Sequence, residues 1–178
     1  MTHVDTPLKV LSLCSGIGGL DLGLGRALNT RMVACVERDP FAASILMDRM
    51  EESALDPCPI WVGDLRELDA KPLAGSIDMV IGGYPCQPFS NAGQRKGEDD
   101  PRHLWPTICD LIRTNRPRFA LFENVSGHVR LGFDAVLADL ASLGFDARWG
   151  SVRASDPAIG APHRRERLFI LAWAATLE

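Results

Sequence analysis

Cys86 lies in a segment whose residue types suit nucleophilic chemistry. Residues 82–90 read Gly-Gly-Tyr-Pro-Cys-Gln-Pro-Phe-Ser and follow an apolar run over residues 77–81. The run is typical of a buried parallel strand, which glycine and proline would end. Ligands of open α/β sheets bind beyond the carboxyl ends of the strands, and a proline on each side limits the backbone around the thiol. We therefore predict that Cys86 is a nucleophile on a rigid loop.

A glycine-rich turn near the N-terminus predicts a nucleotide-binding unit. It separates a β-like run over residues 8–13 from a helical pattern of leucines that begins at Leu20. The turn consists of Cys14, Ser15, Gly16, Ile17, Gly18 and Gly19. Strand, glycine-rich turn and helix form the first unit of many nucleotide-binding domains. The spacing is not Gly-x-Gly-x-x-Gly, so a connection that binds no ligand fits the turn alone equally well.

Two acidic residues follow expected strands at the same edge of the sheet, where the strands have their carboxyl ends. Glu37 comes 21 residues after Gly16, at the end of an expected strand over residues 32–36, where an acid accepts hydrogen bonds from ribose hydroxyls. Asp64 follows an expected strand over residues 60–62 and would face the same crevice. Two interpretations of Asp64 stay open: a ligand contact, and an N-cap for a short helix that begins at Leu65.

Two polar stretches are candidates for contact with a substrate. Residues 91–102 have no hydrophobic period and follow the Cys86 segment, so we predict a lid over that thiol. From Arg148 to Arg167 the chain has five arginines against two acidic residues, Asp156 and Glu166, a local excess of 5 − 2 = 3 positive charges. A solvated turn explains this run most simply, and contact with a nucleic-acid backbone is the alternative.

Composition predicts one soluble domain over residues 1–178. Apolar residues make up 46% of the chain and charged residues 24%, close to the average for globular proteins. The net charge of −4 argues against general affinity for nucleic acid and leaves local contact open. There is no apolar run long enough to span a bilayer and no basic-then-apolar leader, so we expect a cytoplasmic protein with no membrane partner.

The cysteines do not predict a disulfide framework or a metal site. There are five, at irregular spacing and without a Cys-x-x-Cys pair, so we expect neither bridges nor zinc. We interpret Cys35, Cys58 and Cys109 as small buried hydrophobes.

The order of the elements predicts the fold class. Expected strands cover residues 8–13, 32–36, 60–62, 77–81, 119–122, 145–152 and 168–173, and expected helices begin near residues 20, 40, 104 and 133. Such alternation is typical of an α/β domain. We predict a doubly wound, mostly parallel sheet of about seven strands, the last antiparallel, with helices on both faces.

Taken in order, six motifs resemble those of the DNA (cytosine-5) methyltransferases. They lie at residues 13–19, 37–39, 63–65, 83–90, 122–125 and 163–168 and span nearly the whole chain. The Pro-Cys-Gln motif around Cys86, followed by Glu-Asn-Val from Glu123, is the most specific pair. The resemblance implies the class I S-adenosylmethionine-dependent methyltransferase fold and an enzyme of the kind found in restriction-modification systems.

The resemblance also implies where the cofactor binds. S-adenosyl-L-methionine would lie over the glycine turn with its ribose on Glu37 and its adenine near Asp64. The remaining cofactor-binding residues implied are Arg38, Leu65, Gly83 and Pro85. Arg38 stands where the family often has an aromatic residue, and we expect its guanidinium to lie flat on the adenine ring instead.

The implied catalytic residues are Cys86, Glu123 and Arg165. Carbon 5 of cytosine is a poor nucleophile, so the Cys86 thiolate would first add to carbon 6. Glu123 would hydrogen-bond ring nitrogen 3 and the amino group and stabilise the charge that develops there, and Arg165 would brace a base flipped out of the duplex. The implied substrate-binding residues are Gln87, Ser90, Asn124, Val125 and Arg167. His163 stands where the family usually has glutamine.

Family members usually continue with a target-recognition domain and a late segment that completes the cofactor pocket. This chain ends about one strand after the arginine motif. We expect either that a separate target-recognition subunit supplies the missing part, or that the chain is a minimal enzyme, or that it is a shortened inactive form. The intact set Cys86, Glu123 and Arg165 favours activity on DNA. A non-catalytic cofactor- or DNA-binding half of a split enzyme, and methylation of a free pyrimidine nucleotide, are the alternatives.

Overall fold

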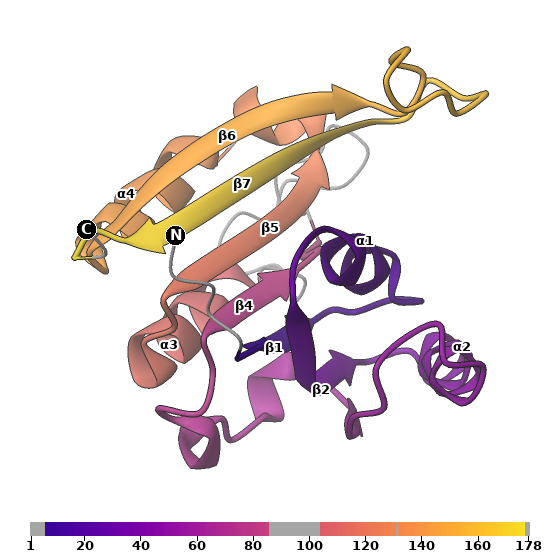
Figure 1. Cartoon of the computed structure of the whole chain (residues 1–178). Helices are drawn as coiled ribbons and strands as arrows, with labels where there is room; N and C mark the ends of the chain where they lie inside the picture. Colours follow the sequence, from indigo (N-terminus) through magenta and orange to yellow (C-terminus); the bar gives the residue numbers. More distant parts are fainter. Residues whose placement is uncertain (1–5, 86–103, 131, 177–178) are drawn as a thin grey trace.

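The computed structural model describes residues 6–85, 104–130 and 132–176, which contain one seven-stranded sheet (Figure 1). The strand order is β3-β2-β1-β4-β5-β7-β6. The strands are β1 (Leu8–Leu13), β2 (Thr30–Glu37), β3 (Ile60–Val62), β4 (Met79–Gly82), β5 (Phe119–Val125), β6 (Phe145–Arg153) and β7 (Glu166–Ala174). Neighbours from β3 to β5 are parallel, whereas β7 is antiparallel to both β5 and β6. The predicted doubly wound sheet with an antiparallel last strand is confirmed.

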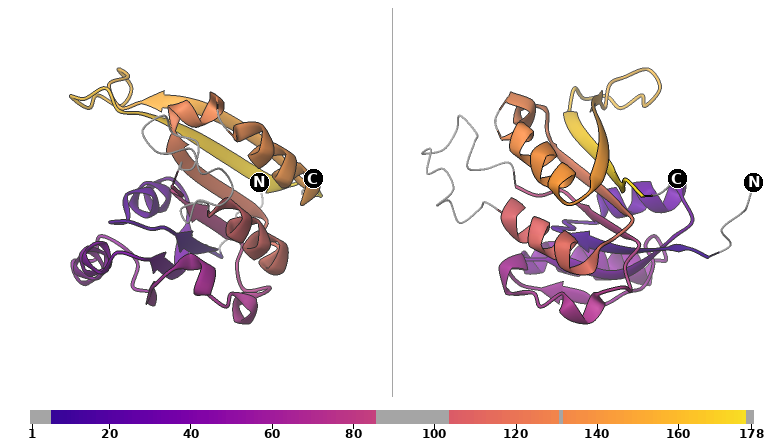
Figure 2. Two further views of the ribbon diagram at one scale, coloured as in Figure 1. Left: turned by 180° about the vertical axis from the view of Figure 1, so that it is seen from behind. Right: turned by 90° about the vertical axis from the view of Figure 1, so that its left-hand side faces the viewer.

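Helices cover both faces of the sheet (Figure 2). They are α1 (Gly19–Ala27), α2 (Pro40–Glu51), α3 (Trp105–Asn115) and α4 (Phe133–Ser142). Leu24 of α1 packs with Val10 on one face, while Ile108 of α3 and Leu140 of α4 pack with Leu11 on the other. Val10 and Leu11 are both fully buried because successive residues of a strand point to opposite faces. This explains why the central strands read as continuous apolar runs.

The structure corrects one expected boundary that bears on function. We expected the fifth strand to end at Phe122, but β5 continues to Val125. The cause is pairing with β7, in which Glu123 lies opposite Phe169 and Val125 opposite Arg167. Glu123 therefore projects from a paired strand rather than from a loop.

Close contact between β1 and β4 explains one glycine at the strand ends. A Cβ on Gly82 would lie 2.7 Å from the carbonyl oxygen of Leu13, which is too close for any other residue without a backbone shift. Gly82 therefore lets β4 reach the same edge as β1. No helix in the described part of the chain is long and apolar enough to cross a membrane.

Candidate active site

Two adjoining pockets lie at the carboxyl ends of the parallel strands, and Cys14 lines both. The first, of about 300 Å³, lies over β2 and β3 and is lined by Glu37, Arg38, Asp64, Leu65 and Pro85, among others. The second, of about 390 Å³, lies over β1, β4 and β5 and includes Gly16, Gly19, Gly83, Glu123, Arg165 and Arg167. We call these the β2 pocket and the β5 pocket. The structure thus brings most of the described candidate residues into one crevice, where the topology predicts a ligand.

The glycine turn is held against β2 by hydrogen bonds. The amide of Ser15 donates to the carbonyl of Val36 at 3.1 Å, and the Ser15 hydroxyl donates to the Ser12 hydroxyl at 2.8 Å. The amide of Gly16 donates to Oε2 of Glu37 at 2.7 Å. Gly18 has φ +79°, in the left-handed region that glycine adopts at little cost. The turn is therefore fixed in position without any ligand.

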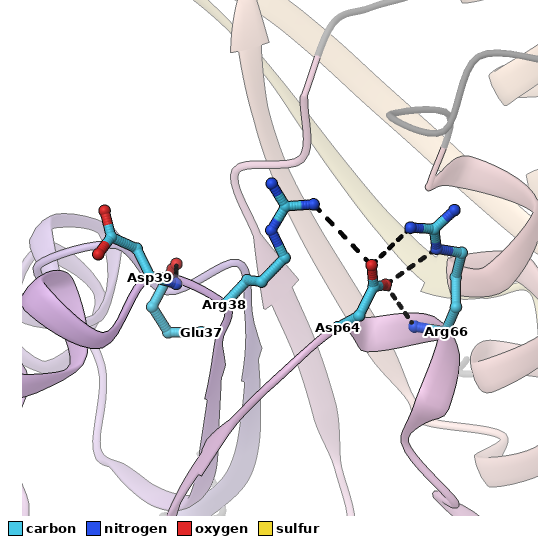
Figure 3. Close-up of polar contacts among 5 residues, drawn as sticks. All are labelled: Glu37, Arg38, Asp39, Asp64 and Arg66. Carbon is cyan, nitrogen blue, oxygen red and sulfur yellow. Dashed lines mark hydrogen bonds and ion pairs between the residues drawn. The ribbon is translucent and has the colours of Figure 1, made fainter.

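Glu37 fastens this turn to the start of α2. While Oε2 accepts from Gly16, Oε1 accepts from the amide of Asp39 at 2.8 Å. Asp39 in turn caps α2, because its side chain accepts from the amide of Phe41 at 2.9 Å. Glu37 and Asp39 are drawn together in Figure 3. The predicted ribose contact of Glu37 stays a prediction, and its carboxylate borders the β2 pocket as that contact requires.

Asp64 is an N-cap held by arginine. It precedes a short 3₁₀ helix, Leu65–Glu67, and accepts from the amide of Arg66 at 3.0 Å, which confirms the capping interpretation. The Arg66 guanidinium also donates to both Asp64 oxygens, at 2.9 and 2.5 Å. Arg66 and then Arg38 lower the pKa of Asp64 to about 2. The adenine contact of Asp64 stays a prediction.

Arg38 reaches across the β2 pocket toward Asp64 (Figure 3). Its Nη1 lies 3.9 Å from Oδ2 of Asp64, and its side chain is 72% exposed. Sequence reasoning missed Arg66 as a partner of Asp64. The only signal for this contact was that Arg66 lies two residues after the candidate N-cap. The stacking of Arg38 on the adenine ring stays a prediction.

The residues present fit a nucleoside-bearing cofactor. A Cβ added at Gly16 or Gly19 would meet no protein atom within 4 Å, and both residues line the β5 pocket. The main chain there borders open space, into which any side chain would project. An acid at the end of β2 and a bare main chain at the start of α1 are the features that a ribose and its attached chain require.

The Cys14 thiol is suited to packing against a bound ligand rather than to nucleophilic attack. Burial, followed by the charges of Glu37 and Asp64, raises the pKa of the Cys14 thiol to about 12. The thiol therefore stays protonated at neutral pH, and a protonated thiol is a weak nucleophile. Cys14 therefore lines both pockets as a protonated thiol.

Glu123 and Arg167 form an ion pair inside the β5 pocket. Nε of Arg167 lies 2.5 Å from Oε1 of Glu123, and both side chains are about one quarter exposed. The antiparallel register of β5 and β7 brings them together diagonally. A Cβ on Gly83 would lie 3.1 Å from the other oxygen of Glu123, so glycine leaves room for this carboxylate. Arg165 is exposed and borders the same pocket.

The chain just before Cys86 is anchored in the core by Tyr84. Its ring packs against Trp105 at 5.3 Å and Phe122 at 5.8 Å, and its hydroxyl lies 3.0 Å from Nε2 of the buried His128. Asn124, 3% exposed, donates to the Tyr84 carbonyl at 3.2 Å. The structure thus gives Asn124 a positioning contact, and its predicted substrate contact stays a prediction. Sequence reasoning missed Tyr84 and His128, because single aromatic residues carry no spacing signal.

The other candidate residues occupy varied positions. Leu65 is 4% exposed, and the Ile17 carbonyl accepts a hydrogen bond from Arg49 of α2. Val125 is 38% exposed at the end of β5. Cys86, Gln87, Ser90 and the predicted lid over residues 91–102 lie outside the described residues. Within the described ranges, no three His, Cys, Asp or Glu side chains group so as to hold a metal ion.

A family model described as C-5 cytosine-specific DNA methylase matches residues 8–178. This chain belongs to that family. The type II methylase M.HgiEI of Herpetosiphon aurantiacus is 32% identical over 168 residues, which cover 92% of this chain and 36% of the relative. The type II methyltransferase M.NgoMIV of Neisseria gonorrhoeae is 33% identical over 167 residues, or 91% and 50% of the two chains. The chain thus spans half or less of these relatives.

Solved structures show the same fold. DNMT2 of Spodoptera frugiperda superposes with a TM-score of 0.78 at 23% identity, covering 96% of this chain and 51% of that chain. The Dnmt2 methyltransferase of S. pombe gives a TM-score of 0.76 at 25% identity, covering 96% and 52%. The resemblance seen in the six motifs is therefore confirmed at the level of family and fold.

Proposed function

We propose that this chain carries the centre that transfers a methyl group from S-adenosylmethionine to carbon 5 of cytosine in DNA. The observation that carries the proposal is the Glu123–Arg167 ion pair in the β5 pocket, beside the glycine turn and the strand that leads to Cys86. Membership of the cytosine-specific family supports it.

The cofactor residues act by holding the donor. S-adenosylmethionine, when bound, supplies an electrophilic methyl group. Glu37 would accept from ribose hydroxyls at the β2 pocket, and the amides around Gly16 and Gly19 would border the rest of the molecule. Because Glu37 already fixes the turn, the pocket is preorganised and little ordering is needed on binding.

The target residues act on the base. Addition of the Cys86 thiolate to carbon 6 would push electron density to carbon 5, which could then form a bond to the donor's methyl group as the bond from that methyl group to the sulfonium sulfur breaks. Loss of the proton from carbon 5 and of the thiolate from carbon 6 restores the ring. Glu123 would bind nitrogen 3 and the amino group of cytosine, and Arg167 fixes the Glu123 carboxylate in place.

DNA contact is expected at an arginine-bearing rim. The β6–β7 connection extends beyond the sheet near the end of β5 (Figure 1), and Arg164 and Arg165 on it are exposed. Arg153 is already paired with Glu166 at 3.3 Å. With a net charge of −4, binding should be modest and should weaken as salt rises.

The decisive experiment is transfer of a labelled methyl group from S-adenosylmethionine to unmethylated duplex DNA. We expect label at carbon 5 of cytosine with the parent protein and none with Cys86→Ala. Cys109→Ala, which removes a buried thiol on α3, is the matched control and should keep activity. Equal transfer by Cys86→Ala, or none by a parent protein that binds the cofactor, would contradict the proposal.

Substrate form is tested in the same assay. Deoxycytidine monophosphate offered in place of the duplex should remain unlabelled. Preferential labelling of the free nucleotide would replace DNA with a nucleotide as the substrate. The alternative of a non-catalytic half is not favoured by any observation in the described parts of the chain.

A further inference from the structure

Two cysteines that are 23 positions apart in the sequence meet where β2 packs against Leu46 of α2 and Leu55. Sγ of Cys35 lies 3.7 Å from Sγ of Cys58. Cys35 is in β2, and Cys58 lies two residues before β3. The amide of Cys35 donates to the carbonyl of Pro59 at 2.9 Å, so the backbones that carry the two thiols are tied together. This register holds the sulfur atoms in van der Waals contact.

The two thiols differ in access and in environment. Cys35 is 1% exposed, whereas Cys58 is partly exposed. Sγ of Cys35 also lies 3.9 Å from Oδ1 of Asp21, a carboxylate that is 2% exposed. An oxidant from solvent therefore meets Cys58 first, with Cys35 directly behind it.

Hydrogen bonding between the two thiols makes Cys58 the more reactive one. The Cys35 thiol lowers the pKa of Cys58, while the same contact and burial raise the pKa of Cys35. A thiolate is the reactive form of cysteine. The partly exposed sulfur thus has more thiolate character than the buried one, which is the arrangement of an attacking and a resolving cysteine.

We propose that Cys35 and Cys58 are an oxidation site, which closes to a reversible disulfide when the protein meets a peroxide. The Cys58 thiolate attacks one oxygen of hydrogen peroxide, which breaks the O–O bond, forms a sulfenic acid and releases one water after protonation. The Cys35 thiol then gives up its proton and attacks Sγ of Cys58, which forms the S–S bond, breaks the S–O bond and releases a second water. The two thiols lose two electrons in total, and the peroxide gains them. A dithiol reductant reverses the bond by exchange.

The geometry needs only a small adjustment. A disulfide has an S–S distance of about 2.05 Å, so the sulfur atoms must approach by less than 2 Å from their present 3.7 Å. Among the other described cysteines, Cys109 lies on α3 with its Sγ 3.9 Å from Oδ2 of Asp139, and Cys14 lies in the glycine turn. Neither has a cysteine contact among the described residues.

The test is peptide mapping without reduction, which does not depend on methyl transfer. The reduced protein is treated with hydrogen peroxide, blocked with N-ethylmaleimide and digested with trypsin. Cys35 and Cys58 fall on the separate peptides 32–38 and 50–66, and Cys14 and Cys109 fall on peptides 10–26 and 103–113. We expect a cross-linked species of 32–38 with 50–66 as the main disulfide, lost after treatment with dithiothreitol.

Two variants serve as test and control. Cys58→Ser replaces the partly exposed sulfur, so it should fold, lose the cross-link completely and leave Cys35 free to react once the protein is unfolded. Cys109→Ser should keep the cross-link at the parent yield. Oxidation of Cys58 to a sulfinic acid with Cys35 still a free thiol would overturn the proposal, as would equal yields of cross-links to Cys14 or Cys109.

Discussion

Two walls of the β5 pocket differ in the groups that shape them. The wall at β5 and β7 depends on side chains: a half-buried ion pair between Glu123 and Arg167, strand residues 44 positions apart. Along the glycine turn, by contrast, the crevice is edged by main-chain groups at Gly16 and Gly19, with Glu37 fixing the turn. Main chain provides shape and hydrogen bonds that few side-chain substitutions remove, whereas one substitution deletes an ion pair. We therefore expect side-chain changes beside β5 to affect catalysis, and glycine changes at the turn to affect binding.

The largest effect is expected for Glu123→Gln. The amide keeps the shape but loses the negative charge that holds Arg167, and in the proposed mechanism it alters hydrogen bonding to the base. Removing one such group at a developing charge costs about 10²- to 10³-fold in kcat. Single-turnover methyl transfer should fall by this amount, while cofactor affinity measured by calorimetry stays within about twofold, a change of under 1 kcal/mol.

Glu166→Gln is the matched control for that variant. Glu166 opens β7 and pairs with Arg153 at 3.3 Å, next along the chain to Arg167. Glu166→Gln should lower kcat by less than about threefold, because exposed ion pairs contribute little to stability. Similar losses in the two variants would show that Glu123 acts through stability and not through the base.

Two glycines of α1 allow an effect on cofactor binding to be separated from an effect on stability. Gly19 opens α1 at the pocket and Gly23 lies one turn later, and a Cβ at either position meets no protein atom within 4 Å. Gly23→Ala should raise the free energy of unfolding by about 0.5–1 kcal/mol, because alanine favours helix. Gly19→Ala places its methyl group in the crevice and should weaken cofactor binding about tenfold, or 1.4 kcal/mol.

Calorimetry of both alanine variants separates the two effects. Affinity should change only for Gly19→Ala, and the chemical step measured at saturating cofactor should change little for either. Unchanged affinity in Gly19→Ala would mean that the cofactor does not approach the start of α1.

A smaller effect, on the salt dependence of DNA affinity, is expected at the arginine-bearing rim. Arg165→Ala removes one exposed cation beside the β5 pocket, so the slope of log affinity for DNA against log salt should fall by about 0.9. Arg26→Ala, in the last turn of α1, removes the same charge far from the crevice and should leave the slope unchanged. Fluorescence anisotropy at several salt concentrations measures both. A common shift in the two variants would show only an effect of net charge.

Sequence reasoning predicted the fold well because its signals are local. Apolar runs gave the strands, and β1 and β3 have the expected bounds. Pairing partners are not local, so the extension of β5 through Glu123 and its contact with Arg167 depended on β7. The same limit applies to Cys35 and Cys58, which were interpreted separately and which the register of β2 and β3 brings together.

Asp64 shows where two local interpretations could not be separated by sequence. A cap and a ligand contact need the same residue at the same place, and the hydrogen bond from the Arg66 amide to Oδ1 of Asp64 shows the capping contact. The Arg66 guanidinium also donates to both carboxylate oxygens. Carboxylates with such partners are satisfied before any ligand arrives. Of the three acids that line the β2 pocket, Glu37, Asp39 and Asp64, only Asp64 has an arginine partner among the described residues.

The smallest effect is expected from breaking the Asp64–Arg66 pair. The pKa of Asp64 is lowered to about 2 from a usual value of 3.8, so the stabilisation it reports is fully present above about pH 4 and is lost as pH falls toward 2. Arg66→Ala should raise this pKa and flatten the dependence of stability on pH between those values. Urea unfolding at pH 7 and pH 3 should show a smaller difference in the variant than in the parent. An identical difference would mean that Arg66 does not hold the carboxylate in solution.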